Sequence, residues 1–292
     1  MNRVLTEDEW RTRIDRHEAR VAVWIEPRLQ RRAEGLPHPV DDFLWTYYRN
    51  RPAALRVWHP GLGVILRGHP PIAGLRGYRR TGVGWSVDPT GIRIDMVRQR
   101  VALLRATAAR PARTNCFGMH EWAMVLGLPQ SQVRHKQVPL RLADTQIEDV
   151  IDDVGLRCTH FDAYRFFTAR ALTRQQPLSR AAQSENEQPG CIHAGMDLYR
   201  YSYESAPYVG SDLVADCFEH ARTAREVDMR ASPYDLSAWG LAPIPIETAS
   251  GRREYADVQA HLARRAQGLR DQLIEALQQM ADIAGSDRAE SA

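Results

Sequence analysis

Lysine is almost missing from this chain of 292 residues: of its 39 lysine and arginine residues, Lys136 is the one lysine. Enzymes that form a Schiff base need a lysine or a terminal amine, so pyridoxal phosphate chemistry is disfavoured. The four cysteines show no CxxC spacing, and we expect them to be reduced thiols. No apolar run approaches the roughly 18 residues of a membrane helix, and the polar residues 1–9 are unlike a signal peptide. We therefore expect a cytoplasmic protein without a membrane partner.

The sequence motifs of several large enzyme classes are missing too. The sequence has no GxxxxGK[ST] P-loop, no GxGxxG motif after a strand and no GxSxG elbow. His120 and Glu121 open like the HExxH motif of zinc proteases, but the fifth position is Met124 rather than histidine. These absences argue against a P-loop NTPase, a Rossmann-type dehydrogenase, a serine hydrolase of the GxSxG type and a zincin.

The hydrophobic pattern predicts a mainly α protein. Thr6 and Glu9 form a capping box at the start of a long amphipathic helix over about 6–34. Further helices are expected at about 96–109, 117–127, 194–206, 211–231 and 252–284. The polar segment 173–190 indicates a surface loop.

One stretch departs from the helical pattern. Residues 56–96 are rich in glycine and proline and contain three short strand-like runs, the last two separated by a turn at 88–91. We therefore expect a single helical domain over 1–285, with a small antiparallel β insert at about 56–96 and a frayed tail at 286–292.

The segment 115–128 (NCFGMHEWAMVLGL) is apolar on nearly every side of a helix, so we expect it to be buried. It nevertheless carries His120 and Glu121 side by side. An unpaired buried carboxylate is costly, so both side chains need partners. A structural histidine with a Glu–Arg pair and a pair of reactive or metal-binding groups are both compatible with this pattern.

Two further histidines have a carboxylate at a spacing that brings the side chains together. His160 and Asp162 lie among aromatic residues, and an extended chain would put both on one face. His193 precedes Asp197 by one helical turn, so both can face one centre. Such pairs share a metal or relay a proton, and each is also compatible with a hydrogen bond in the core.

The predicted helix over 211–231 carries most of its acidic residues on one face, which we expect to be solvated: Asp212, Asp216, Glu219 and Glu226. Asp228 differs because it projects on the apolar side. A carboxylate directed into the core needs a cation, and we expect Arg165 or Arg230 to supply it. Asp228 is therefore the strongest candidate for a catalytic carboxylate.

Four strings of the sequence resemble a bacterial family that is labelled 3-methyladenine DNA glycosylase, over about residues 5–275: NCFGMHEWAMV, PGCIHAGMDLYRY, SDLVADCF and REVDMRASPYDL. The resemblance implies a monofunctional N-glycosylase that removes an alkylated purine such as 3-methyladenine from DNA. Such an enzyme stacks a flipped base in an aromatic pocket. A carboxylate then stabilises the developing sugar cation or activates water.

Residues of this chain suit those roles. The candidate catalytic residues are Asp228, Glu121 and His120. The candidate substrate-binding residues are Trp122, Tyr164, Phe166, Arg165 and Arg230. The rings would stack on a cationic base, and a net charge of +3 permits DNA as a partner without requiring it.

A metalloenzyme is the alternative. The candidate metal ligands are His160, Asp162, His193 and Asp197; together with His120 and Glu121 they would suit one or two non-haem Fe or Mn ions in a helical scaffold. The reaction would then be the oxidation or hydrolysis of a small-molecule substrate. In a third class, a non-catalytic interaction domain, the buried acids would be purely structural.

Overall fold

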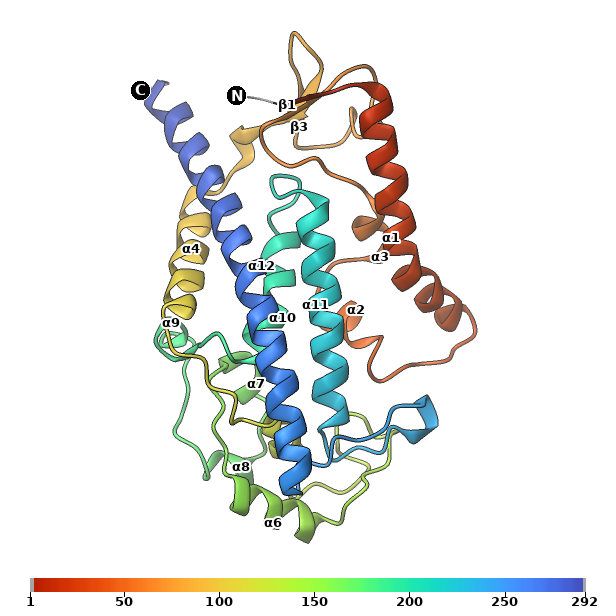
Figure 1. Cartoon of the computed structure of the whole chain (residues 1–292), viewed down its shortest axis with the longest axis vertical. Helices are drawn as coiled ribbons and strands as arrows, with labels where there is room; N and C mark the ends of the chain where they lie inside the picture. The colour runs from red at the N-terminus through yellow and green to blue at the C-terminus, as the bar shows by residue number, and fades with distance from the viewer. Residues whose placement is uncertain (1–2, 291–292) are drawn as a thin grey trace.

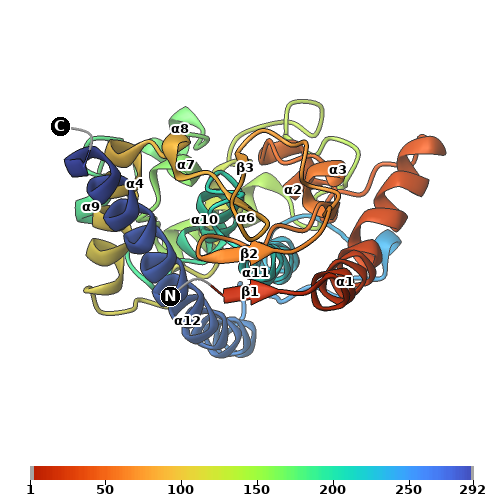
Figure 2. The same cartoon turned by 90° about the horizontal axis from the view of Figure 1, so that it is seen from above.

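The computed structural model describes the backbone of residues 3–290 and the side chains of residues 3–285. Within this part the chain is mainly α-helical and carries one small four-stranded sheet, as the sequence predicts. The five longest helices are α1 (Glu7–Ala33), α4 (Ile94–Ala108), α10 (Ile192–Tyr203), α11 (Ser211–Arg230) and α12 (Ala249–Glu290). In both views α10, α11 and α12 lie between α4 on one side and α1 on the other (Figures 1 and 2).

The long helices bury their apolar stripes against one another. Helix α10 packs on α11 and α12, and α12 packs on α4. Helix α1 begins with the predicted capping box of Thr6 and Glu9 and buries Val21 and Ile25 in the main core. Phe218 of α11 and Leu273 of α12 lie in the same core, with 1% and 0% of their surface exposed. This packing forms the scaffold that holds the buried polar side chains described below.

Short helices fill the connections between the long ones. They are α2 (Phe43–Tyr47), α3 (Pro52–Arg56), α5 (Met119–Ala123), α6 (Asp144–Val154), α7 (Phe161–Tyr164), α8 (Ala169–Leu172), α9 (Gln183–Asn186) and the 3-10 turns η1 (Pro89–Gly91) and η2 (Ser237–Trp239). The helix predicted over 117–127 is thus only five residues long. Phe117 and Gly118 have positive φ angles of 48° and 67°, so the chain turns there instead of continuing a helix.

The sheet has the order β1-β2-β4-β3, from β1 (Arg3–Leu5), β2 (Val64–Leu66), β4 (Trp85–Val87) and β3 (Tyr78–Arg80). Strands β2, β4 and β3 pair antiparallel, and an antiparallel sheet was predicted in this stretch. However, β3 lies outside the three predicted strand-like runs, and β1 joins β2 in parallel. The sheet is therefore mixed and recruits residues before the insert. A strand of three residues is too short for alternation to reveal it.

Three further expectations need correction. The third strand-like run, 91–96, leads into α4, which begins at Ile94, and 88–91 contains the turn η1 rather than a hairpin turn. The polar segment 173–190 contains α9 and ends in two buried side chains, Glu187 and Gln188, so it is not wholly a surface loop. Helix α12 continues to Glu290, into the expected tail, whose last residues 291–292 lie outside the described part.

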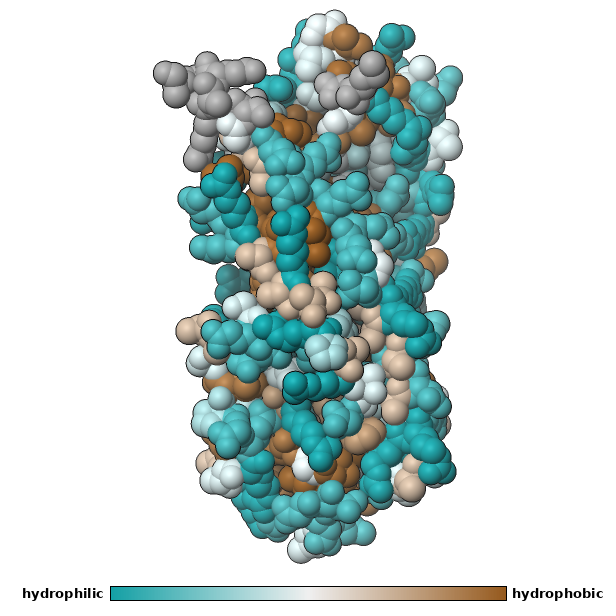
Figure 3. Space-filling model, turned by 60° about the vertical axis from the view of Figure 1, so that its left-hand side comes forward, coloured by the Kyte–Doolittle hydropathy of each residue, from teal (hydrophilic) through white to brown (hydrophobic). Residues whose placement is uncertain are grey.

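The outer surface matches this packing. Hydrophilic side chains cover most of the face in Figure 3, and hydrophobic ones are recessed between them. Among the described residues, no helix has the length and apolar character needed to cross a membrane.

Candidate metal centre

A small cavity lies where α5, α7 and α10 meet inside the protein. Its volume is about 30 Å³, enough for one or two water molecules or an ion. Three histidines and three carboxylates line it together with aromatic side chains: His120, Glu121, His160, Asp162, His193 and Asp197. The structure thus brings together all six residues that the sequence indicated for a metalloenzyme. Five of them belong to two adjacent clusters, the first of which also includes Asp228.

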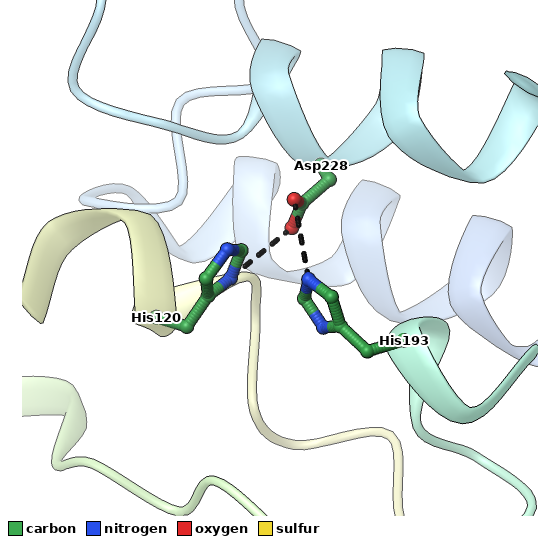
Figure 4. Close-up of side chains that lie close together, drawn as sticks. All are labelled: His120, His193 and Asp228. Atoms are coloured by element: carbon green, nitrogen blue, oxygen red, sulfur yellow. Dashed lines mark ion pairs between the residues drawn. The ribbon is translucent and has the colours of Figure 1, made fainter. Parts of the chain in front are cut away.

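The first cluster contains His120, His193 and Asp228 (Figure 4). His120 lies on the short helix α5, His193 in the first turn of α10, and Asp228 near the end of α11. Oδ1 of Asp228 is 3.5 Å from Nδ1 of His120, and its Oδ2 is 3.7 Å from Nε2 of His193. Asp228 has no exposed surface, which confirms that it points into the core.

These two carboxylate–imidazole distances are too long for direct hydrogen bonds, which measure roughly 2.7–3.2 Å. They are close to the edge of a tetrahedron, about 3.3–3.6 Å, around a metal with ligand bonds of about 2.0–2.2 Å. Among the described residues, Oδ1 of Asp228 has no hydrogen-bond partner, and a buried acceptor without a partner is unfavourable. A cation between the three side chains would satisfy it.

A buried arginine balances part of the negative charge. Arg225, 1% exposed, donates from Nη1 to Glu121 at 2.5 Å and to Asp228 at 3.3 Å. Its Nη2 lies 3.1 Å from Nε2 of His135. One guanidinium therefore faces two carboxylates. Oε2 of Glu121 has no hydrogen-bond partner in the described part of the chain, so the cluster can accept further positive charge.

The protonation of the cluster follows from burial and from these neighbours. Burial and the adjacent Glu121 raise the pKa of Asp228 to about 6, although His120 and Arg225 oppose the shift. Burial and the neighbouring imidazoles of His120 and His160 hold the pKa of His193 well below its ordinary value. His193 is therefore neutral at pH 7, which is the form that binds metals. Burial alone would lower the pKa of His120, but Asp228 and Glu121 raise it.

The second cluster contains His160, Asp162 and Asp197. Nε2 of His160 is 3.6 Å from Asp197, and its Nδ1 is 2.9 Å from the buried Glu187. Arg200 donates to Asp197 at 2.6 Å and to Asp162 at 3.4 Å. Oδ1 of Asp162 accepts a hydrogen bond from Arg180 and forms an ion pair with Arg165 at 3.2 Å. Oδ1 of Asp197 accepts a hydrogen bond from the Tyr48 hydroxyl at 3.1 Å.

The two clusters therefore differ in how completely their carboxylate oxygens are hydrogen-bonded. Every carboxylate oxygen of Asp162 and Asp197 already has a cationic or hydroxyl donor. The first cluster leaves oxygens of Asp228 and Glu121 without a hydrogen bond in the described part. Carboxylates whose oxygens are all paired have little to gain from a metal, whereas the first cluster retains open acceptor positions. The first cluster is the better candidate for a metal centre.

Several sequence-based assignments need correction. His160 begins α7 as its N-cap residue rather than lying in a strand. The predicted partners of Asp228 were wrong: Arg165 pairs with Asp162, and Arg230 donates to the backbone oxygen of Ala242 at 2.9 Å. Arg225, three residues before Asp228, supplies the cation instead.

The predicted aromatic residues divide between the cavity and the core. Trp122 has no exposed surface and donates to the backbone oxygen of Ala231 at 2.8 Å, so it offers no face for stacking. Tyr164 packs in the core against Phe167. Phe166 does line the cavity, with the Arg165 and Arg134 guanidiniums 4.3 and 5.1 Å from its ring centroid.

Three residues that contact the two clusters were not predicted from the sequence. Arg225 had a detectable signal, since its i, i+3 spacing puts it beside Asp228 on one helix. Glu187 lies in a polar segment that showed no sign of burial. Tyr48 belongs to an aromatic run of α2 and its end, and nothing in the sequence connects it to Asp197, 149 residues away.

Comparisons with protein-family models, with curated proteins and with solved structures found no match for this chain.

Proposed function

We propose that the protein is a metal-dependent enzyme that binds one non-haem Fe or Mn ion through His120, His193 and Asp228. The observation that carries the proposal is the spacing of the three side chains, 3.5 and 3.7 Å from carboxylate to imidazole, around a buried acceptor without a hydrogen bond among the described residues. Two histidines and one carboxylate leave coordination positions open, and this ligand set is typical of non-haem Fe(II) enzymes. A metal with open positions is suited to catalysis rather than to a purely structural role.

The cavity beside the cluster would hold the reacting group. His120 and His193 line it, whereas Asp228 does not. Glu121 also lines it and carries an oxygen without a hydrogen-bond partner in the described part. When bound, the metal would act as a Lewis acid or as a redox centre. Glu121, held ionised by Arg225, would accept a proton from the reacting molecule. The proposed reaction is therefore the oxidation or hydrolysis of a small molecule.

The experiment that tests this proposal is reconstitution of chelator-treated protein with Mn(II). We expect one tightly bound equivalent in the wild type and in the His261→Ala control, whose imidazole is exposed on α12. His193→Ala should lose that equivalent. Equal Mn(II) binding by the wild type and His193→Ala, or none by the wild type under anaerobic loading with either Mn(II) or Fe(II), would refute the assignment.

Base excision from alkylated DNA is the second candidate. Phe166 favours it, because its half-buried ring lines the cavity between two arginines, a setting compatible with a base and its phosphates. A volume of about 30 Å³ is far below the roughly 300 Å³ of the smallest ordinary ligand pockets, so a purine requires the cavity to open. Release of free 3-methyladenine from methylated DNA by metal-free protein would establish this function. If no base is released, base excision is excluded.

A further inference from the structure

A cleft of about 1340 Å³ lies between α1 and the segment that runs from α2 through α3. It is more than large enough for an organic ligand, since ordinary small-molecule sites measure roughly 300–1,000 Å³. The cavity at the metal centre is too small for such a molecule in this conformation. The body of a larger substrate would need additional space beside the small cavity.

The cleft has a cationic rim. Five arginines line it, against two glutamates: Arg28, Arg32, Arg49, Arg51 and Arg56, with Glu18 and Glu26. Arg28 and Arg56 are already paired, with Asp42 and Glu26. The other three guanidiniums are exposed and form no ion pair with any described residue. Free guanidiniums at the edge of a cleft favour a carboxylate, which they bind through paired N–H groups.

The walls of the cleft include several exposed apolar side chains. Leu29 and Leu75 are 40% and 44% exposed, which is unusual for leucine in this protein, and both line it. Trp45, Trp58 and Ile72 extend this surface inward. Exposed leucines beside free guanidiniums offer both an apolar contact and a cationic contact to one ligand.

Tyr48 lies between the cleft and the small cavity. Its side chain lines both the cleft and the small cavity, and its hydroxyl donates to Asp197 at 3.1 Å. The next residues are held by tyrosines of α10: the Arg49 N–H donates to the Tyr203 hydroxyl at 3.2 Å, and the Asn50 amide donates to the Tyr199 hydroxyl at 2.9 Å. Tyr48 thus borders both spaces.

We propose that this cleft binds an amphipathic organic anion, with an apolar body against Leu29 and Leu75 and a carboxylate head at Arg49 and Arg51. The cleft is then the substrate site of the metal centre, and this second statement rests on the proposed function. The binding itself does not depend on the metal.

Calorimetric titration of metal-free protein with dodecanoate tests the proposal. We expect saturable binding to one site in the wild type. The double variant Arg49→Glu/Arg51→Glu should weaken it by about tenfold or more, a loss of about 1.4 kcal/mol. The matched control Arg98→Glu/Arg253→Glu reverses two exposed arginines outside the cleft and should leave binding unchanged. The milder double variant Arg49→Ala/Arg51→Ala should show an intermediate loss of dodecanoate affinity. It keeps the test valid if the charge-reversed protein misfolds.

Three results would overturn the cleft assignment: no binding of dodecanoate, equal binding by all variants, or equal binding of dodecyltrimethylammonium, which carries the opposite charge. Because the protein is metal-free in this titration, these outcomes are independent of the Mn(II) experiment. Dodecanoate binding without metal binding would retain the anion site and refute the proposed enzyme. Metal binding without dodecanoate binding would refute the anion site and retain the proposed metal centre.

Discussion

His193 and Asp197 lie one turn apart on α10, yet their side chains belong to different clusters. Nε2 of His193 faces Asp228 at 3.7 Å, while Oδ2 of Asp197 faces His160 at 3.6 Å. The rings of His193 and His160 stack with centroids 5.7 Å apart, so the two clusters touch. Substitutions on a single helix can therefore separate a metal-binding role from a structural one.

The first prediction concerns Asp228. Replacing it with asparagine keeps the shape of the side chain but removes the charge that would bind the cation, so Asp228→Asn should lose most Mn(II) affinity. The cooperative unfolding transition should remain. Asp216→Asn, on the solvated side of the same helix, is the matched control and should bind Mn(II) normally. Unchanged affinity in Asp228→Asn, measured by equilibrium dialysis, would exclude Asp228 as a ligand.

The second prediction concerns Asp197. Its two oxygens accept from Tyr48 and Arg200 in a fully buried setting, and breaking a buried ion pair costs about 3–5 kcal/mol. Asp197→Asn should therefore lower the free energy of unfolding by a few kcal/mol while the metal content at saturation stays the same. Urea unfolding and metal analysis of one sample measure both quantities. Loss of metal at unchanged stability would place the ion in the second cluster instead.

The third prediction concerns Arg225. Its removal takes away the guanidinium shared by the buried carboxylates Glu121 and Asp228 and leaves His120 as their neighbouring cationic group, so Arg225→Met should destabilise the metal-free protein by about 3–5 kcal/mol. Arg222→Met, on the same helix, removes an exposed partner of Asp41 and should cost no more than about 1 kcal/mol. Added Mn(II) should restore part of the lost stability in Arg225→Met, because it supplies positive charge to the same cluster. Equal urea midpoints for the two variants would contradict this account.

The fourth prediction concerns acid stability and lies outside the site. Burial, with help from Arg265 and Arg270, lowers the pKa of His220 from 6.5 to about 4. Between these values the unfolded chain binds a proton that the folded protein does not. Stability should therefore be complete above pH 6.5 and fall as the pH drops toward 4, by about 3 kcal/mol for this one histidine.

Urea unfolding at several pH values checks the acid effect. His220→Asn cannot titrate, so its stability should depend less on pH over this window than that of the wild type. His261→Asn, exposed on α12, should follow the wild type. Identical pH profiles for His220→Asn and the wild type would show that another group causes the acid sensitivity.

Periodicity along one element predicted what that element presents to the core. Asp228 on the apolar side of α11 and the buried pair of His120 and Glu121 follow from helical spacing and from the cost of burying charge. Arg225 was predictable by the same reasoning, because it lies one turn before Asp228.

Contacts between distant elements were not predictable in this way. The grouping of His193 with His120 and Asp228 depends on how α5, α10 and α11 cross, and no local pattern encodes that. Phe117 and Gly118 shorten the helix at α5 through positive φ angles, which sets the direction of the His120 side chain. Glu187 reaches His160 from a segment whose polarity is typical of a surface loop.

The most direct test of the central claim is a crystal structure of the Mn(II)-soaked protein with anomalous scattering data. The account predicts one strong anomalous peak at about 2.0–2.3 Å from His120, His193 and Asp228, with Glu121 and the small cavity on its open side. A peak between His160, Asp162 and Asp197 would transfer the centre to the second cluster. No peak at either cluster, in crystals of protein that is folded and saturated with Mn(II), would contradict the metalloenzyme itself.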